Sequence, residues 1–238
     1  MTELLYQTDS YTQEFQATVT GQRAEENAVI LDRTYFYPGG GGQPGDTGTL
    51  AITGMDALTV RKARKEGQDV LHILEGELPD TGVEVHGRID WDHRYQLMRT
   101  HTALHILCGV VFRDYGALVT GGNMEPLKGR MDFEFETLRG ELVAEIEAAV
   151  NKEVDAGREV LVKIFPREEA FKIPDLIRTK INLLPEGIQE VRTVEIVGLD
   201  LQADGGTHVR NTSEVGRIKV ADYKSKGAIN KRIYIEII

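Results

Sequence analysis

The spacing of apolar residues changes near residue 90, and this change limits the fold more than any other feature of the chain. Before that point, short apolar runs alternate with polar residues and are separated by Gly, Asp or Pro, as is typical of β-strands. After it, apolar residues and two histidines recur every three or four positions over 91–111, which predicts a helix. The clearest early runs are 28–31, 48–52 and 83–86. We therefore expect an α+β protein with an all-β domain over 1–90 and a second domain over 91–238.

The second domain is expected to mix helix and strand. Either Asp90 or Asp92 can cap its first helix. A second helix is predicted over 138–154, where apolar residues form one stripe and acidic residues the other. Strands are predicted at 130–135, 160–165, 191–197, 216–223 and 232–238, the last two joined as a hairpin across 226–228.

Composition narrows the class of protein. Hydrophobic residues make up 41% of the 238 and charged residues 28%, and no run approaches the roughly 18 apolar residues of a membrane span. The first five residues show no secretory signal, so a cytoplasmic protein with no membrane partner is expected. Cys108 is the only cysteine, which excludes an intramolecular disulfide and any multi-cysteine zinc ribbon. A metal would therefore need histidine and carboxylate ligands.

The net charge of −10 argues against extended binding along a nucleic-acid backbone, and no DNA partner is expected. Two local basic clusters exist, and each could meet a short RNA end or could form the solvated face of a hairpin. They are 61–65 and the group Lys224, Lys226, Lys231 and Arg232.

His101 and His105 stand four residues apart on the predicted helix. Their Cβ atoms would lie about 5–6 Å apart on one face, a separation that one metal ion can bridge, although such pairs also occur by chance. The apolar surroundings favour the metal, because two buried free imidazoles would each need hydrogen-bond partners. Thr102 occupies the position where the zinc-protease motif has its glutamate base, so a peptidase is not expected.

A second candidate segment ends in Asp204-Gly205-Gly206-Thr207-His208. Three histidines and Asp204 would make a tetrahedral site, or a three-histidine site with an open position if Asp204 stays outside it. Alternatively, Asp204 simply stabilises a turn. Cys108 lies about 10.5 Å along the helix axis from His101, at about 1.5 Å per residue, and is expected to be a core residue.

The stretch 35–48 contains four successive glycines followed by Gln43 and Pro44. No helix follows to receive a pyrophosphate and no Gly-Lys-Ser or Gly-Lys-Thr is present, so neither a dinucleotide site nor a P-loop is expected, and the chemistry should be independent of ATP. The glycines either form a barrel corner or let a ligand approach the main chain, with Gln43 presented to it.

In combination, residues 36–44, the His101/His105 pair and residues 204–208 resemble the AlaX family, free-standing relatives of the editing domain of alanyl-tRNA synthetase. The resemblance implies an N-terminal small β-barrel, followed by a two-layer α/β editing domain that holds zinc. It also implies hydrolysis of serine, and often glycine, from the acceptor end of mischarged tRNA(Ala). By resemblance, Thr34 contacts the seryl hydroxyl, Gln43 positions the substrate, and Gly40, Gly41 and Gly42 line its site.

The chain departs from the family pattern at Asp204, where the family has a cysteine ligand. A carboxylate keeps the negative charge but makes the site harder and more tolerant of other divalent ions. Asp204 has three possible interpretations: it is a ligand, it leaves a three-histidine site with water, or activity has been lost. In the last case the chain would be a metal-stabilised module that binds the 3′ end of tRNA without catalysis.

Overall fold

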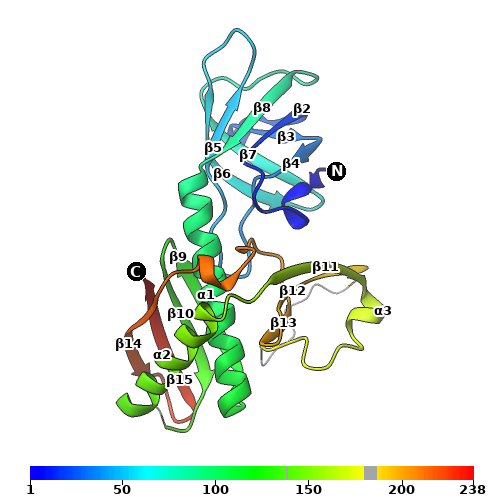
Figure 1. Cartoon of the computed structure of the whole chain (residues 1–238). Helices are drawn as coiled ribbons and strands as arrows, with labels where there is room; N and C mark the ends of the chain where they lie inside the picture. The colour runs from blue at the N-terminus through cyan, green and yellow to red at the C-terminus, as the bar shows by residue number, and fades with distance from the viewer. Residues whose placement is uncertain (138, 180–186) are drawn as a thin grey trace. The chain divides into compact units, whose positions relative to one another are not determined.

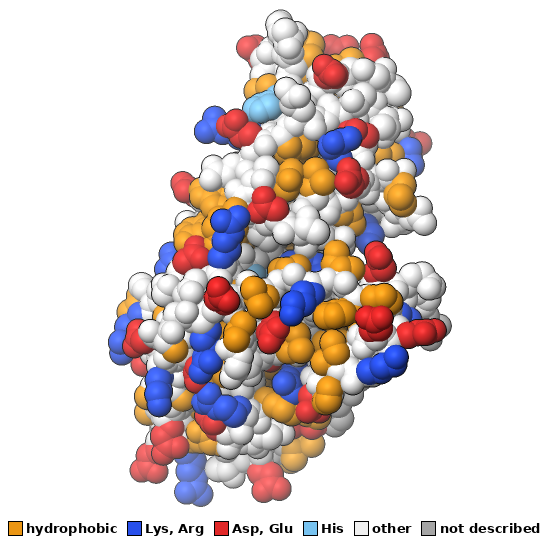
Figure 2. Space-filling view, turned by 45° about the vertical axis from the view of Figure 1, so that its right-hand side comes forward, with side chains coloured by type: hydrophobic (Ala, Val, Ile, Leu, Met, Phe, Trp, Pro, Cys, Tyr) orange, Lys and Arg blue, Asp and Glu red, His pale blue; other side chains and the backbone are white. Residues whose placement is uncertain are grey.

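A computed structural model describes residues 1–137, 139–179 and 187–238 (Figure 1). The chain divides into two compact units, Met1–Tyr95 and Gln96–Ile238, so the first residues of the long helix α1 (Trp91–Tyr115) belong to the first unit. No helix in the described ranges has the length and apolar content needed to cross a membrane. On the face in Figure 2, acidic and basic side chains are interspersed with apolar ones.

The first unit is built on a closed barrel with strand order β2-β3-β7-β6-β5-β8. Its strands are β2 (Glu14–Arg23), β3 (Ala28–Leu31), β5 (Gly48–Ala51), β6 (Leu58–Glu66), β7 (Asp69–Glu75) and β8 (Glu84–Ile89). Phe15, Ala17 and Val19, at alternate positions of β2, point into the barrel core, which explains the alternation in the sequence. Three predicted runs coincide with β3, β5 and β8, and the predicted small barrel is confirmed.

Closure of the barrel depends on a close approach between β5 and β8. Gly48 pairs with Ile89, and a Cβ atom at Gly48 would lie 2.1 Å from the Arg88 carbonyl oxygen. Only glycine fits there. Outside the barrel, β1 (Glu3–Leu4) pairs in parallel with β4 (Arg33–Thr34). Two short 3₁₀ helices, Leu5–Gln7 and Ala24–Glu26, complete the unit.

The second unit combines two sheets with helices, which confirms the mixed α+β class. A four-stranded sheet has the order β14-β15-β10-β9 and a three-stranded sheet the order β11-β12-β13. Their bounds are β9 (Val119–Glu125), β10 (Lys128–Glu134), β11 (Val160–Pro166), β12 (Glu190–Ile196), β13 (Asp200–Ala203), β14 (Ile218–Ser225) and β15 (Asn230–Ile237). The remaining helices are α2 (Gly140–Asp155), α3 (Arg167–Ala170) and the 3₁₀ helix Thr212–Glu214. The predicted β14/β15 hairpin forms as expected.

The helix α1 begins where the sequence predicts but is buried differently. Asp90 caps it, because its carboxylate accepts a hydrogen bond from the His93 backbone N–H at 3.2 Å. From residue 100 to residue 111 every side chain is buried, so the helix is enclosed on all sides rather than along one stripe. This enclosure removes water from His101 and His105.

The helix α2 is amphipathic, as predicted, and contacts β14. Its predicted first residue, Leu138, lies outside the described residues. The buried stripe includes Val143 and Ile146, while Leu142 is only half-buried. Glu153 is buried on the same helix and is balanced by two arginines at 2.5 and 2.6 Å, Arg113 and Arg158.

Candidate metal centre and glycine-rich loop

Four side chains of the second unit converge on one point. They are His101 and His105 of α1, and Asp204 and His208 of the segment that follows β13. One donor atom from each lies within 4.8 Å of the donor atom of every other. Three of these side chains are no more than 7% exposed and Asp204 is 14% exposed. The candidate ligand set predicted from the sequence is thus assembled in one dry pocket.

The ring contacts show how tightly the imidazoles are gathered. The rings of His101 and His208 are stacked with their centroids 4.2 Å apart, and His105 meets each of them edge-on. The helical spacing of four residues places the α1 pair together. The Gly205–Gly206 pair adopts no left-handed conformation, since neither residue has a positive φ.

The carboxylate of Asp204 serves the turn and the cluster at the same time. Its Oδ2 accepts a hydrogen bond from the Gly206 backbone N–H at 2.7 Å and lies 3.0 Å from His208 Nε2. Its Oδ1 lies 3.5 Å from His101 Nε2. Arg192 holds the main chain of the same residue, donating to the Asp204 carbonyl at 2.9 Å. The turn and ligand readings of Asp204 are therefore compatible.

Burial favours the neutral form of two of the three imidazoles, which is the form that can bind a cation. Burial lowers the pKa of His208 to about 4 and holds the pKa of His101 well below its usual range. Burial opposes the charge on Asp204, but the neighbouring imidazoles outweigh it and hold the pKa of that carboxyl well below its usual range. Burial also disfavours the charged form of His105, yet the hydrogen bond and charge of Asp200 raise its pKa overall.

These donors fit a divalent metal. Neutral imidazole nitrogens and a carboxylate oxygen are zinc ligands, and bonds of about 2.0–2.1 Å in tetrahedral geometry separate ligand atoms by about 3.3 Å. The separation of 3.0 Å between His208 Nε2 and Asp204 Oδ2 is close to that value, and all four donor atoms lie within 4.8 Å of one another.

Two further side chains contact the outer nitrogens of the histidines. Thr102 Oγ1 lies 3.1 Å from His208 Nδ1, and Asp200 Oδ2 lies 3.0 Å from His105 Nδ1. From the sequence, Thr102 was interpreted only as the position of a missing base, and no role was predicted for Asp200. The sequence did hold a signal for Asp200: Asp200, Gln202 and Asp204 fall on alternate positions, which would place them on the same face of a strand.

Cys108 is buried and stays outside the cluster of four. Gln202 donates to its sulfur at 3.3 Å, and burial raises the pKa of the thiol. A protonated thiol is a weak ligand and a weak nucleophile, in agreement with the predicted core role.

The glycine-rich loop of the first unit is a tight turn. The backbone N–H groups of Gly40 and Gln43 donate to each other's carbonyl oxygens at 3.0 and 2.9 Å. Gly41 and Gly42 between them have φ of 57° and 89°, which side-chain-bearing residues rarely adopt. Gln43 is 3% exposed. The geometry satisfies the barrel-corner reading, and the substrate role of these residues stays a prediction.

A buried ion pair anchors this loop. The guanidinium of Arg94 donates to both oxygens of Asp46, through Nε to Oδ1 at 2.8 Å, and both side chains are fully buried. It also donates to the carbonyls of Ser10 and Tyr35. Asp46 in turn accepts from the Tyr37 backbone N–H. One arginine thus joins both ends of the loop to the start of α1.

Thr34, the predicted contact for a seryl hydroxyl, is completely buried within the first unit. Its Oγ1 accepts a hydrogen bond from the Phe36 backbone N–H at 3.0 Å and lies 2.8 Å from His72 Nε2. His72 Nδ1 faces the Val29 carbonyl at 3.4 Å, which places the ring proton on Nδ1. Thr34 therefore donates to His72 and retains one lone pair that could accept from a substrate hydroxyl.

The environment of His72 predicts a specific acid sensitivity. Burial lowers its pKa to about 4 from the ordinary 6.5, so below pH 6.5 the unfolded chain takes up a proton that the folded chain refuses. Stability from this group is complete above pH 6.5 and falls by about 3 kcal/mol as the pH drops toward 4. We expect a His72→Gln variant to lose about 3 kcal/mol less unfolding free energy than the parent between pH 6.5 and pH 4, as measured by urea unfolding at each pH. Parallel losses in variant and parent would contradict the assignment.

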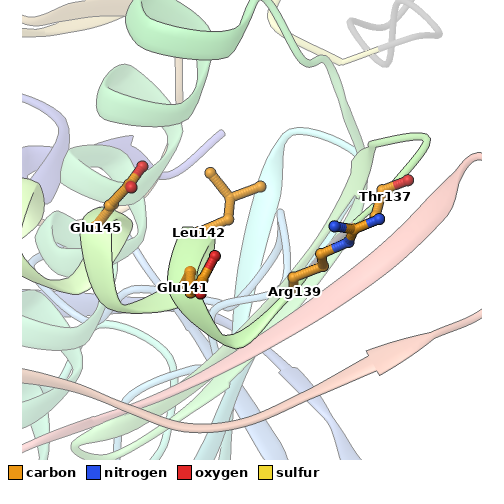
Figure 3. Close-up of a pocket in the computed structure, with 5 residues that line it drawn as sticks. All are labelled: Thr137, Arg139, Glu141, Leu142 and Glu145. Atoms are coloured by element: carbon orange, nitrogen blue, oxygen red, sulfur yellow. The ribbon is translucent and has the colours of Figure 1, made fainter.

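One surface hollow lies apart from the predicted site residues. A hollow at the start of α2 is lined by Thr137, Arg139, Glu141, Leu142 and Glu145 and includes none of the predicted site residues (Figure 3).

Both basic clusters lie on hairpins, and several of their cations are engaged within the chain. Arg64 pairs with Glu26, and Arg232 donates to both oxygens of Asp132. Lys231 donates to the carbonyls of the hairpin turn. Both clusters therefore lie on hairpin faces, as one interpretation expected, and contact of either with an RNA end stays a prediction.

Known proteins are similar to this chain along its whole length. Residues 5–93 match the family model described as tRNA synthetases class II (A), and residues 191–234 match the threonyl and alanyl tRNA synthetase second additional domain. The alanyl-tRNA editing protein AlaX-M of Saccharolobus solfataricus is 41% identical over 100% of this chain and 99% of its own length. AlaX-M of Methanosarcina barkeri is 38% identical over 100% of both chains. The alanine–tRNA ligase of Ignicoccus hospitalis is 39% identical over 92% of this chain but only 24% of the ligase.

Proposed function

Because the chain belongs to the AlaX family of alanyl-tRNA editing proteins, we propose that it removes serine, and also glycine, from tRNA(Ala) charged with either in error. Editing of this kind hydrolyses a carboxylic ester, and the chain is an aminoacyl-tRNA deacylase. The observation that best supports metal-dependent chemistry is the buried cluster of three histidines and Asp204. A cytoplasmic location, in contact with the acceptor end of tRNA(Ala), is part of the proposal.

His101, His105, His208 and Asp204 would hold one divalent ion, with zinc as the first choice. When bound, such an ion can polarise the ester carbonyl, lower the pKa of a water or orient the substrate's amino group. Asp204 supplies a negative charge and the three imidazoles supply nitrogen donors, and their burial keeps bulk water from competing for the same positions. An aminoacyl ester is already activated, so a dedicated base such as the glutamate that Thr102 replaces is not required.

The first unit would supply selectivity. An active site discriminates poorly against an analogue that is only slightly smaller, whereas a hydrogen bond to a substrate hydroxyl discriminates strongly. The free lone pair of Thr34 suits a seryl hydroxyl, which would donate to it. Gln43 would position the aminoacyl group, and Gly40, Gly41 and Gly42 would allow a close approach of the substrate to the main chain.

The proposal is tested by deacylation of tRNA(Ala) charged separately with serine, glycine and alanine. We expect the purified chain to hydrolyse the seryl ester rapidly and to spare the alanyl ester. Equal rates on serine and alanine, or no hydrolysis of either, would refute it. If the chain binds the charged tRNA but never deacylates it, the alternative of a metal-stabilised tRNA-end binding module is supported instead.

An Asp204→Ala variant in the same assay, with its metal content measured, shows whether Asp204 is a metal ligand. Loss of both metal and activity identifies Asp204 as a working ligand. Retention of both would show that the three histidines suffice, with water in the remaining position.

A further inference from the structure

A buried carboxylate stands behind one of the candidate ligands. Asp200, the first residue of β13, is 4% exposed, and its Oδ2 lies 3.0 Å from His105 Nδ1. An ionised carboxylate can only accept hydrogen bonds, so the proton of the imidazole must be on Nδ1. The lone pair of His105 is then on Nε2, the nitrogen left for a metal.

Asp200 is itself fixed by two neighbours. Gln202 donates from Nε2 to the same Oδ2 at 2.7 Å, and Arg178 Nε lies 3.5 Å from Oδ1. The guanidinium of Arg178 rests on the ring of Phe112, 3.8 Å from its centroid. A buried carboxylate needs a compensating charge of this kind, and the hydrogen bond from Gln202 fixes the position of its Oδ2.

The partner of His208 is different in kind. Thr102 Oγ1 faces His208 Nδ1 at 3.1 Å and also accepts from the Val209 backbone N–H at 3.3 Å. The threonine hydroxyl can donate or accept in this contact, and it carries no charge. The two orienting contacts are therefore unequal, with a carboxylate behind His105 and a hydroxyl behind His208.

We propose that Asp200 is a positioning residue of the metal centre, which holds His105 with Nδ1 protonated and Nε2 presented to the ion. The proposal rests on the metal site of the proposed function. A carboxylate hydrogen-bonded to a ligand histidine fixes the ring and raises its basicity as a donor, and loss of such a partner typically lowers metal affinity about 10–100-fold. His105 is accordingly oriented by a stronger contact than His208.

The test compares zinc affinity, measured by competition with a chelator, in the parent chain and in Asp200→Asn. We expect binding to the variant to be weaker by about 10–100-fold, since asparagine keeps the shape and loses the charge. Asp132→Asn is the matched control, because Asp132 is also buried and paired with an arginine in the same unit but is not among the four clustered residues. The control should bind zinc as the parent does.

A second measurement needs no variant. Long-range proton–nitrogen NMR of the zinc-loaded parent chain should show His105 with Nδ1 protonated, whereas the opposite tautomer would overturn the proposal even if Asp200→Asn failed to fold. Unchanged zinc affinity in Asp200→Asn would also overturn it, while leaving the metal site intact. A parent chain that binds no zinc would instead refute the metal site itself, and the role of Asp200 with it.

Discussion

Replacement of His208 with alanine is expected to remove the bound metal and to slow deacylation of seryl-tRNA(Ala) by at least about a hundredfold. His208 contributes a neutral imidazole, because burial lowers its pKa to about 4, and its Nε2 lies 3.0 Å from Asp204. Loss of an outer partner of a ligand already lowers affinity about 10–100-fold, and loss of the ligand itself should lower it further.

Metal content and single-turnover deacylation of the same sample measure both effects of the His208→Ala change. His86→Ala is the matched control, because the His86 side chain is 46% exposed, lies in the barrel and is not part of the cluster. The control should keep one metal per chain and the parental rate. A His208→Ala variant that did the same would show that the cluster is not the catalytic centre.

An Arg94→Met variant is expected to lose about 3–5 kcal/mol of unfolding free energy. Arg94 and Asp46 are both fully buried, and methionine would leave the carboxylate without its charge partner inside the protein. The carbonyls of Ser10 and Tyr35 would lose their donors as well. Since this arginine anchors the glycine-rich loop, its loss should also impair deacylation by the folded fraction.

Urea unfolding followed by the fluorescence of Trp91 measures the loss in Arg94→Met. Arg33→Met is the comparison, because Arg33 pairs with Asp32 at 3.2 Å while its side chain is 50% exposed. Exposed pairs contribute less than about 1 kcal/mol, so this variant should unfold nearly as the parent does. Equal midpoints for Arg94→Met and the parent would contradict the anchoring role.

The periodicity of the sequence predicted most elements because local repetition determines them. The alternating runs became β3, β5 and β8, and the three- and four-residue spacing became α1. β13 was missed because it spans only four residues, two of them polar. The burial of α1 on all sides between residues 100 and 111 was also missed, since periodicity reports the preferred face of a helix and not how many elements finally cover it.

At the candidate site, the sequence predicted which residues meet but not what surrounds them. His101 and His105 share a helical face by local geometry, and the resemblance joined them to the 204–208 segment. The contacts of Asp200 with His105 and of His72 with Thr34 join residues 95 and 38 positions apart. Spacing along the chain carries no signal for such pairs, so only the folded structure places them together.

The most direct test of a metal-dependent editing enzyme is the rate of seryl-tRNA(Ala) hydrolysis before chelation, after chelation and after zinc is restored. Alanyl-tRNA(Ala) serves as the companion substrate throughout. The predicted result is rapid hydrolysis of the seryl ester alone, its loss with chelator and its recovery with zinc. Hydrolysis that persists at the parental rate in a chain shown to be metal-free would contradict the central claim.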